Sequence, residues 1–135
     1  MRFPLRVLNA VCDAIGADRV GIRLSPFSEY QGMQGLCEDP LAVFLPWTKA
    51  ILAAQPELAY IHVIEPRVVG AIFDADDSTI SGYSSLPLRE LVDKSPNTKF
   101  MAAGGFTPET AEETIEEYGG LVALGRYYIG EPLVL

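Results

Sequence analysis

The hydrophobic positions near the start of the chain first follow the spacing of a helix and then the pattern of a buried strand. Apolar residues recur at intervals of three and four along one predicted helical face, namely Leu8, Val11, Cys12 and Ile15. Gly16 follows this stripe, as expected for a helix C-terminal cap. Residues 20–24 then form a short apolar run that ends before Pro26, because proline has no N–H for strand pairing. A helix over residues 5–15 and a strand over residues 20–24 are therefore predicted.

The same alternation continues through the middle of the chain. Asp39 and Pro40 are the residue types of an N-cap and a first helical residue, and they predict a helix that runs to about residue 54. Pro46 lies inside this segment and is expected to kink or interrupt the helix, because its ring removes a backbone donor. The next strand is predicted at residues 59–64.

Two further helices and two further strands complete the pattern. Thr107 and Pro108 begin the last predicted helix, and Gly119 with Gly120 closes it. The apolar residues of this helix lie on one predicted face and are Ala111, Ile115 and Tyr118. The other predicted elements are a helix over residues 86–94, a strand over residues 99–103 and a strand over residues 121–124.

Strands that alternate with helices, and that read as continuous apolar runs, indicate a parallel sheet with helical crossovers. The predicted fold class is therefore α/β, with about four parallel strands in one domain, since no linker-like segment interrupts the chain. Four strands with helices on one side leave two sheet edges and one sheet face uncovered. We therefore expect self-association or a complementary partner.

Composition narrows the classes of function. The net charge of −8 argues against a nucleic-acid partner, which needs clustered basic residues, and no segment has the roughly 18 apolar residues of a membrane span. Cys12 and Cys37 lack metal-ligand spacing, and no secretory leader is recognisable. The sequence favours a cytoplasmic protein with free thiols that binds neither nucleic acid nor membrane.

Glycines mark the ends of two predicted neighbouring strands. Gly104 and Gly105 follow one strand and lead into the helix that begins after Thr107, so backbone N–H groups there could hold a phosphate. Gly125 and Arg126 follow the next strand and add backbone donors and a positive charge. Ordinary turn chemistry is the alternative interpretation of each glycine site on its own.

Other polar residues leave alternatives open. Arg23 lies in an apolar strand, where it either pairs with Glu65 or faces a ligand. His62, the single histidine, is more typical of a hydrogen-bonded core residue than of a catalyst. An acidic group is best interpreted as a solvated loop and consists of Asp74, Asp76 and Asp77.

Four motifs together resemble the C-terminal half of the Old Yellow Enzyme family of FMN-dependent ene-reductases, which includes 12-oxophytodienoate reductases. They are AIGADRVGIRLSPF, YIHVIEPRV, AAGGFTPETAEE and LVALGRYYIGEP. The resemblance implies half of a (β/α)8 TIM barrel, with residues 1–135 as a single partial domain that supplies its fifth to eighth strands. It also implies FMN as cofactor, NAD(P)H as reductant and a small enone-type substrate with an activated C=C bond.

The resemblance also implies site residues. Arg23 matches the arginine beside flavin N1 and the C2 carbonyl, and Tyr30 falls near an aromatic position of the substrate pocket. The residues that match the FMN phosphate site are Gly104, Gly105, Gly125 and Arg126. No catalytic residue and no metal ligand is carried over, because the family's substrate-activating pair and proton-donor tyrosine have no match in this chain.

Two hypotheses follow from this departure. The first is an FMN oxidoreductase piece that is incomplete alone and needs a second copy of itself or a complementary N-terminal half-barrel. It predicts binding of the phosphate end of FMN with little or no ene-reduction. The second is a non-catalytic truncated half-barrel or assembly module in which Arg23 pairs with Glu65 and flavin chemistry is lost.

Overall fold

The structure, a computed structural model, describes residues 1–28, 39–66, 83–125 and 129. Every predicted helix and strand is present there, and no boundary differs from the prediction by more than three residues. The helices are α1 (Arg2–Ile15), the 3-10 helix η1 (Ala17–Arg19), α2 (Pro40–Ala54), α3 (Leu86–Val92) and α4 (Pro108–Tyr118). The strands are β1 (Gly21–Leu24), β2 (Tyr60–Ile64), β3 (Lys99–Ala103) and β4 (Leu121–Ala123).

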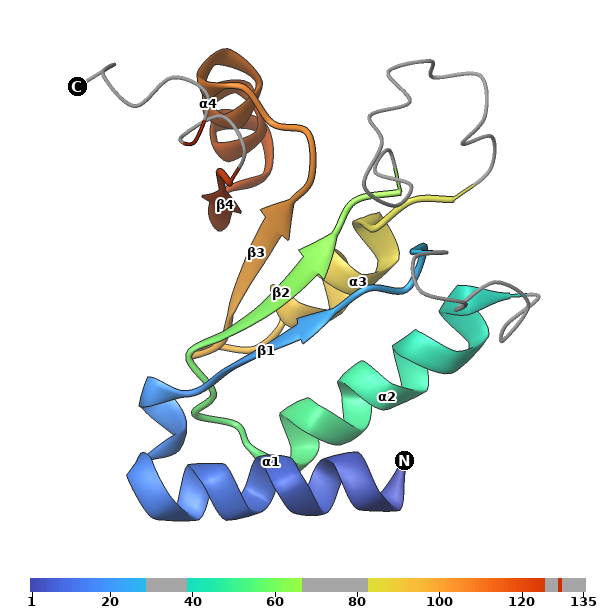
Figure 1. The fold of residues 1–135 in the computed structure, drawn as a ribbon, viewed down its shortest axis with the longest axis vertical. Coiled ribbons are helices and arrows are strands. Elements are labelled where there is room, and N and C mark those ends of the chain that lie inside the picture. The colour runs from blue at the N-terminus through green and yellow to red at the C-terminus, as the bar shows by residue number, and fades with distance from the viewer. Residues whose placement is uncertain (29–38, 67–82, 126–128, 130–135) are drawn as a thin grey trace.

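The four strands form one parallel sheet in the order β1-β2-β3-β4 (Figure 1). Each strand is therefore adjacent to the next one along the chain, and helices make the crossovers. The α/β class and the parallel sheet predicted from sequence are confirmed. In this register Arg23 lies opposite His62, and His62 lies opposite Met101.

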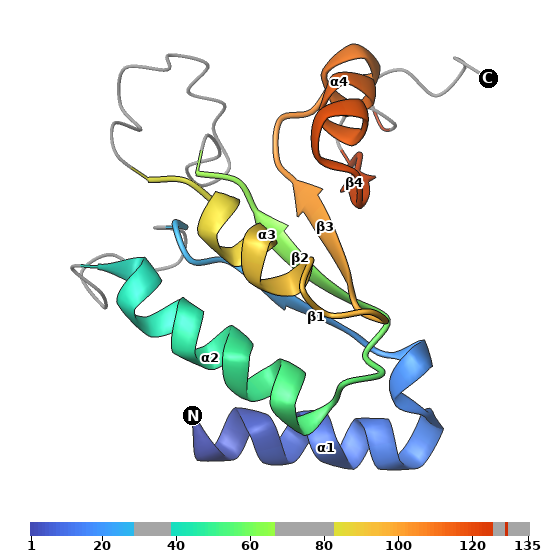
Figure 2. The ribbon, with the colours of Figure 1, turned by 180° about the vertical axis from the view of Figure 1, so that it is seen from behind.

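The hydrophobic core lies between one face of the sheet and the helices. Ile61, Val63 and Phe100 point to this face and are fully buried. They pack with residues of α2 and α3, which Figure 2 shows from the helix side of the sheet. The alternate strand positions, among them Arg23 and His62, point to the opposite face. Among the described residues no helix covers this second face, which we call the open face.

Helix α2 runs through Pro46 without a break, so the predicted interruption is wrong. Pro46 and Ala42 both lie on the exposed side of the helix, where water can bond the carbonyl that lost its N–H partner. The predicted cap is confirmed, because Asp39 accepts hydrogen bonds from the N–H groups of Leu41 and Ala42 at 3.0 and 3.2 Å.

Two predicted apolar faces are only partly buried. In α1, Leu8 and Cys12 are buried, whereas Val11 and Ile15 are 41% and 50% exposed. In α4, Ala111 is buried, whereas Ile115 and Tyr118 are 44% and 42% exposed. Helix α1 packs mainly against η1 and α2, and α4 mainly against β4, so the outer sides of both helices lack a neighbouring element in the part of the chain that the structure describes.

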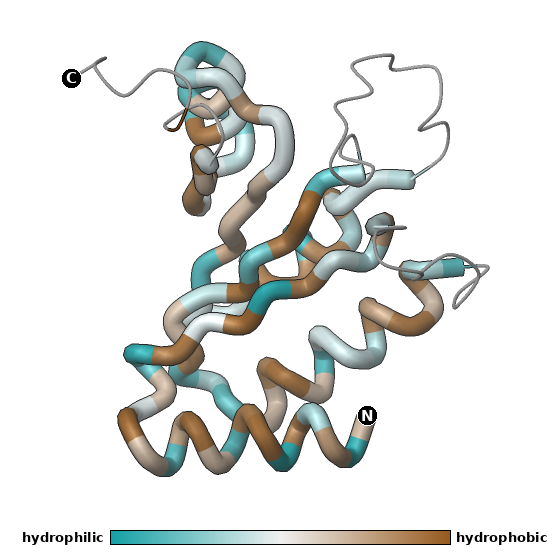
Figure 3. Tube along the Cα trace, viewed as in Figure 1, coloured by the Kyte–Doolittle hydropathy of each residue, from teal (hydrophilic) through white to brown (hydrophobic). Residues whose placement is uncertain are grey.

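Figure 3 shows hydrophobic segments recurring along α1 and α2. None of the described helices is long and apolar enough to cross a membrane.

Candidate functional site

The C-terminal ends of β3 and β4 lie side by side and carry the two predicted glycine sites. Ala103 and Ala123 are paired in the register of the sheet, so the residues after them leave the sheet together. Gly104 and Gly105 follow Ala103, and Gly125 follows β4 after one residue. The structure therefore brings these three glycines together at the C-terminal ends of two neighbouring strands.

The backbone at the end of β3 needs glycine. Gly104 has a φ angle of 116° and Gly105 a φ angle of 63°, and residues other than glycine rarely adopt either value. At Gly125 a Cβ atom would meet nothing within 4 Å. These glycines therefore leave backbone groups open to close approach, although those of Gly104 also make a contact within the chain.

The N-terminus of α4 differs from the predicted set of unpaired donors. The N–H of Thr110 donates to Thr107 Oγ1 at 3.3 Å, and the N–H of Thr107 donates to Thr110 Oγ1 at 3.0 Å. Hydrogen bonds from Thr107 and from the backbone N–H of Glu109 lower the pKa of the Glu109 carboxyl. The helix therefore satisfies its own first donors and carries a negative charge there, so an anion would have to use the glycine backbone.

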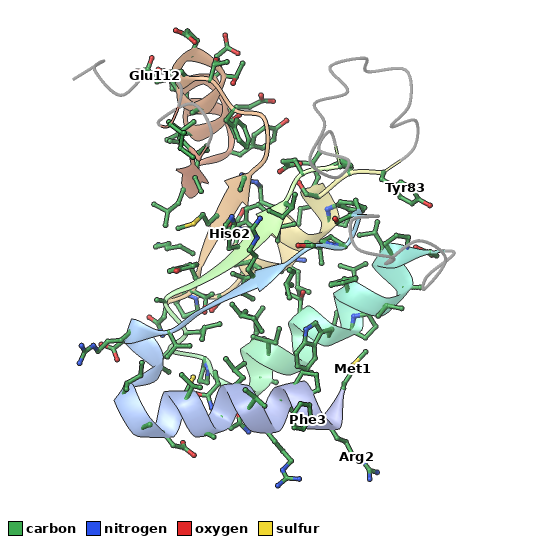
Figure 4. The ribbon with its side chains drawn as sticks, in the orientation of Figure 1. Met1, Arg2, Phe3, His62, Tyr83 and Glu112 are labelled. Carbon is green, nitrogen blue, oxygen red and sulfur yellow. The ribbon has the colours of Figure 1, made fainter. Side chains whose placement is uncertain are left out.

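Arg23 projects from β1 on the open face and is exposed. It lies opposite His62 of β2, which Figure 4 labels near the centre of the sheet. Burial, and secondly the charge of Arg23, lower the pKa of His62. The structure thus places the predicted cation beside an imidazole whose protonated form is disfavoured.

His62 is half-buried, and its Nε2 atom is buried without a hydrogen-bond partner within the described residues. Nε2 therefore lacks the bond expected of a satisfied core histidine.

Glu65 does not pair with Arg23. Its two carboxylate oxygens accept hydrogen bonds from Ser85 Oγ at 2.7 and 2.8 Å, and its N–H donates to the carbonyl of Ala103. No ion pair joins Arg23 to another residue in the part of the chain that is described. The signature expected of the non-catalytic hypothesis is therefore not found.

Arg89 is a buried charge that the sequence interpretation missed. Its guanidinium lies 4.5 Å from the centre of the Phe100 ring and 5.4 Å from that of Tyr118. Its Nη1 atom donates to the carbonyl of Gly119 at 3.1 Å, at the C-terminal end of α4. The available signal was its position three residues before Val92 in the apolar stripe of α3. Arg89 joins α3, β3 and α4 behind the sheet, on the side away from Arg23.

A cavity of about 290 Å³ lies between α3 and α4, and its lining includes Glu65, Arg89 and Tyr118. Because both helices cover the core face, this cavity is separate from the open face that carries Arg23.

Several predicted residues lie outside the described residues: Tyr30, Cys37, Asp74, Asp76, Asp77 and Arg126. The predicted contributions of Tyr30 and Arg126 to a site therefore stay predictions. Among the residues that are described, no group of three or more acidic, histidine or cysteine side chains could hold a metal ion. Cys12 is a buried free thiol, and burial raises its pKa.

A family model described as NADH:flavin oxidoreductase / NADH oxidase matches residues 1–135. The chain belongs to this family. It is 36% identical over 134 residues to 12-oxophytodienoate reductase 2 of Arabidopsis thaliana, covering 97% of this chain and 32% of that protein. It is 37% identical over 136 residues to a chanoclavine-I aldehyde reductase of Penicillium roqueforti, covering 97% of this chain and 34% of that protein.

Solved structures agree with this assignment. Morphinone reductase matches with a TM-score of 0.71 at 30% identity, covering 95% of this chain and 31% of that one. The old yellow enzyme of Trypanosoma cruzi matches with a TM-score of 0.70 at 26% identity, covering 95% and 30%. The chain thus spans about a third of the length of the relatives it matches, and its four parallel strands correspond to part of their TIM barrel. The resemblance to Old Yellow Enzymes is confirmed, and this family implies FMN with NAD(P)H as reductant.

Proposed function

We propose that the ends of β3 and β4 bind the phosphate of FMN and that the chain supplies this part of a flavin oxidoreductase. The observation that carries the proposal is the adjacency of Gly104, Gly105 and Gly125, two of them at positive φ. Backbone without Cβ atoms can approach a phosphate closely, and a phosphate site near the last two strands is frequent in TIM barrels.

The phosphate contacts are assigned to the glycines and to Arg126. The first donors of α4 are occupied by Thr107 and Thr110, and the carboxylate of Glu109 would repel a second negative charge. The backbone N–H groups around Gly105 and Gly125 then provide direction, and the guanidinium of Arg126 provides charge. This division of roles follows from the capping of α4.

Arg23 is assigned to the N1 and C2-carbonyl end of the flavin ring. When bound, FMN supplies hydride chemistry, taking a hydride from NAD(P)H and passing it to an activated C=C bond. Arg23 is a cation on the open face with no ion-pair partner among the described residues. A fixed positive charge there stabilises the negative charge that develops at that end of the ring. The neutral state favoured for His62 keeps Arg23 from facing a second cation.

We place the chain at the fifth to eighth strands of the family barrel, with Tyr30 near the substrate pocket. The family's substrate-activating pair and proton donor have no match here, so we expect the isolated chain to reduce enones slowly or not at all. The non-catalytic alternative predicted an ion pair between Arg23 and Glu65, and Glu65 bonds Ser85 instead. The geometry therefore favours flavin binding.

The test is a fluorescence titration of FMN into the wild-type chain and into an Arg126→Gln variant. Loss of a charged phosphate contact should weaken FMN binding at least about tenfold. The matched control is Arg19→Gln, an exposed arginine in η1 at the opposite end of β1, which should leave binding unchanged. Equal affinities of all three proteins would show that Arg126 does not hold the phosphate.

Activity of the pure chain provides a second test. Oxidation of NADPH with 2-cyclohexenone and saturating FMN should not exceed the rate with free FMN alone. Clear enzyme-dependent turnover would contradict the expectation that the isolated chain lacks the groups needed for ene-reduction.

A further inference from the structure

Helix α1 has a wider apolar surface than the described part of the chain covers. At roughly 100° per residue, its apolar residues span an arc of about 220° around the helix axis. The part that packs against the core spans about 60° and consists of Leu5, Leu8 and Cys12. A surface helix that packs on a single core typically uses an apolar stripe of roughly 100°. The remaining arc is therefore wide enough for a second contact.

The uncovered part of this arc, which we call the α1 surface, is continuous and exposed. Its large side chains are Phe3, Val7, Val11 and Ile15, with exposed fractions from 41% to 75%. They recur every four residues and form one ridge along the helix, and the small Ala10 and Ala14 beside it let a second helix approach closely. Figures 1 and 2 show α1 at one end of the molecule, where its main neighbours are α2 and η1.

The charges at the two ends of α1 oppose the dipole of the helix. Arg2 lies in the first turn and Asp13 in the last turn, and both are exposed. A helix is partially positive at its N-terminus and partially negative at its C-terminus, so each charge is unfavourable within its own helix. In an antiparallel pair of α1 helices, each charge lies beside the oppositely charged end of the other helix. The charge pattern of α1 therefore favours an antiparallel neighbour of the same kind.

The apolar ridge and the charges agree on one register for such a pair. When Val7 lies opposite Val11 of a second α1 helix, the same register places Phe3 opposite Ile15. Arg6 then falls within one residue of Asp13 of the second helix. Arg6 and Asp13 lie on the same side of α1, since they are about two turns apart, and a two-fold axis brings that side of both helices together. A parallel pair would instead place like charges opposite each other.

We propose that the α1 surface binds the α1 surface of a second copy of this chain, with the two helices antiparallel about a two-fold axis. Each copy contributes the same apolar ridge, and two pairs of Arg6 with Asp13 flank the contact. The assembly closes at two copies, because the surface binds only itself. One helix from each copy makes a small interface, so we expect a reversible equilibrium between monomer and dimer. The proposal goes beyond the flavin site and does not depend on FMN binding.

Sedimentation velocity over a range of protein concentrations tests the association. The expected larger species has a mass of about 29 kDa, twice the 14.7 kDa of one chain. A monomer at every concentration up to about 1 mM would overturn the proposal and indicate that a different polypeptide covers the surface. Species that grow beyond a dimer as the concentration rises would overturn the closed two-fold arrangement.

A substitution in the ridge locates the contact. Val11→Asp places a carboxylate near the centre of the apolar contact in both copies and should raise the dimer dissociation constant at least about a hundredfold. The matched control is Val43→Asp on α2, since Val43 and Val11 are both 41% exposed and Val43 lies outside the α1 surface. Circular dichroism verifies that both variants are folded. An unchanged dimer in Val11→Asp, or an equal loss in the control, would contradict the proposed surface.

Charge reversal tests the antiparallel register and leaves the apolar ridge intact. Arg6→Asp or Asp13→Arg alone replaces two attractive pairs with two repulsive ones and should weaken the dimer about tenfold. The double variant restores both pairs with reversed polarity and should dimerise as the wild type does. In a parallel pair like charges already face each other, so neither single reversal would weaken the dimer. Single variants with the wild-type dissociation constant would therefore overturn the antiparallel arrangement.

Discussion

At the scale of single residues, the open face carries the neighbouring side chains of Arg23 and His62. The two residues are opposite each other in neighbouring strands, and Arg23 adds to the effect of burial in lowering the pKa of His62. The sequence predicted that Arg23 needs a partner or a ligand. It could not show that Glu65 is engaged by Ser85, because that contact joins residues 20 positions apart.

The pKa of His62 can be measured directly, because the chain contains one histidine. An NMR titration of the imidazole C–H signal should give a pKa below the ordinary value of 6.5. Arg23→Gln should raise it while leaving it below that value, since burial, the larger cause, remains. An Arg23→Gln titration that matches the wild type would show that the charge of Arg23 does not reach His62.

The same shift affects stability with a defined sign. Because the pKa of His62 is lower in the folded chain, the unfolded chain binds a proton first as the pH falls through about 6.5. The free energy of unfolding should therefore decrease below that pH, and His62→Gln should remove this part of the pH dependence. Urea denaturation at pH 5 and pH 7.5 measures the free energy of unfolding at each pH. If the variant loses as much stability between the two pH values as the wild type, the prediction is contradicted.

Arg89 should contribute to stability through its contacts with α4. Arg89→Met retains the volume but leaves the carbonyl of Gly119 without its charged donor and removes the contacts with the two rings. We expect a loss of about 1–3 kcal/mol in the free energy of unfolding. Urea denaturation measures it, with Arg19→Met as the exposed control. No loss would mean that water replaces the guanidinium.

At the scale of elements, local rules predicted the caps well and the extent of burial poorly. The caps at Asp39 and Thr107 depend on neighbouring residues and were recognisable from residue type. The apolar stripes of α1 and α4 were also recognisable, but periodicity shows only which side of a helix is apolar. It does not show whether another element covers that side, as Val11 and Ile115 demonstrate.

The capping box of α4 provides a test at this scale. Thr107→Ala removes the acceptor for the N–H of Thr110 and should lower the free energy of unfolding by about 1 kcal/mol. The control is Thr114→Ala in the same helix, whose hydroxyl donates to the carbonyl of Thr110 at 2.7 Å. This bond does not cap the helix, so the control should change stability by less than about 0.5 kcal/mol. Equal effects would contradict a role for the cap.

At the scale of the whole molecule, the sequence motifs predicted the family and the parallel α/β sheet, and both are confirmed. The strand order in the sheet is the order along the chain, because each strand pairs with the next one. The proposed phosphate site was predicted only in part. The two glycine strand ends do meet, whereas the donors of α4 are used within the helix by Thr107 and Thr110. Residue types indicate where a helix starts, but only the three-dimensional structure shows which groups its first N–H donors bond.

The most direct test of the central claim is a comparison of FMN with riboflavin in parallel fluorescence titrations of the wild-type chain. The two ligands share the isoalloxazine ring and differ in the phosphate. The account predicts that FMN binds at least about tenfold more tightly, because the glycine ends of β3 and β4 with Arg126 hold the phosphate. Equal affinities, or no binding of either ligand, would contradict it.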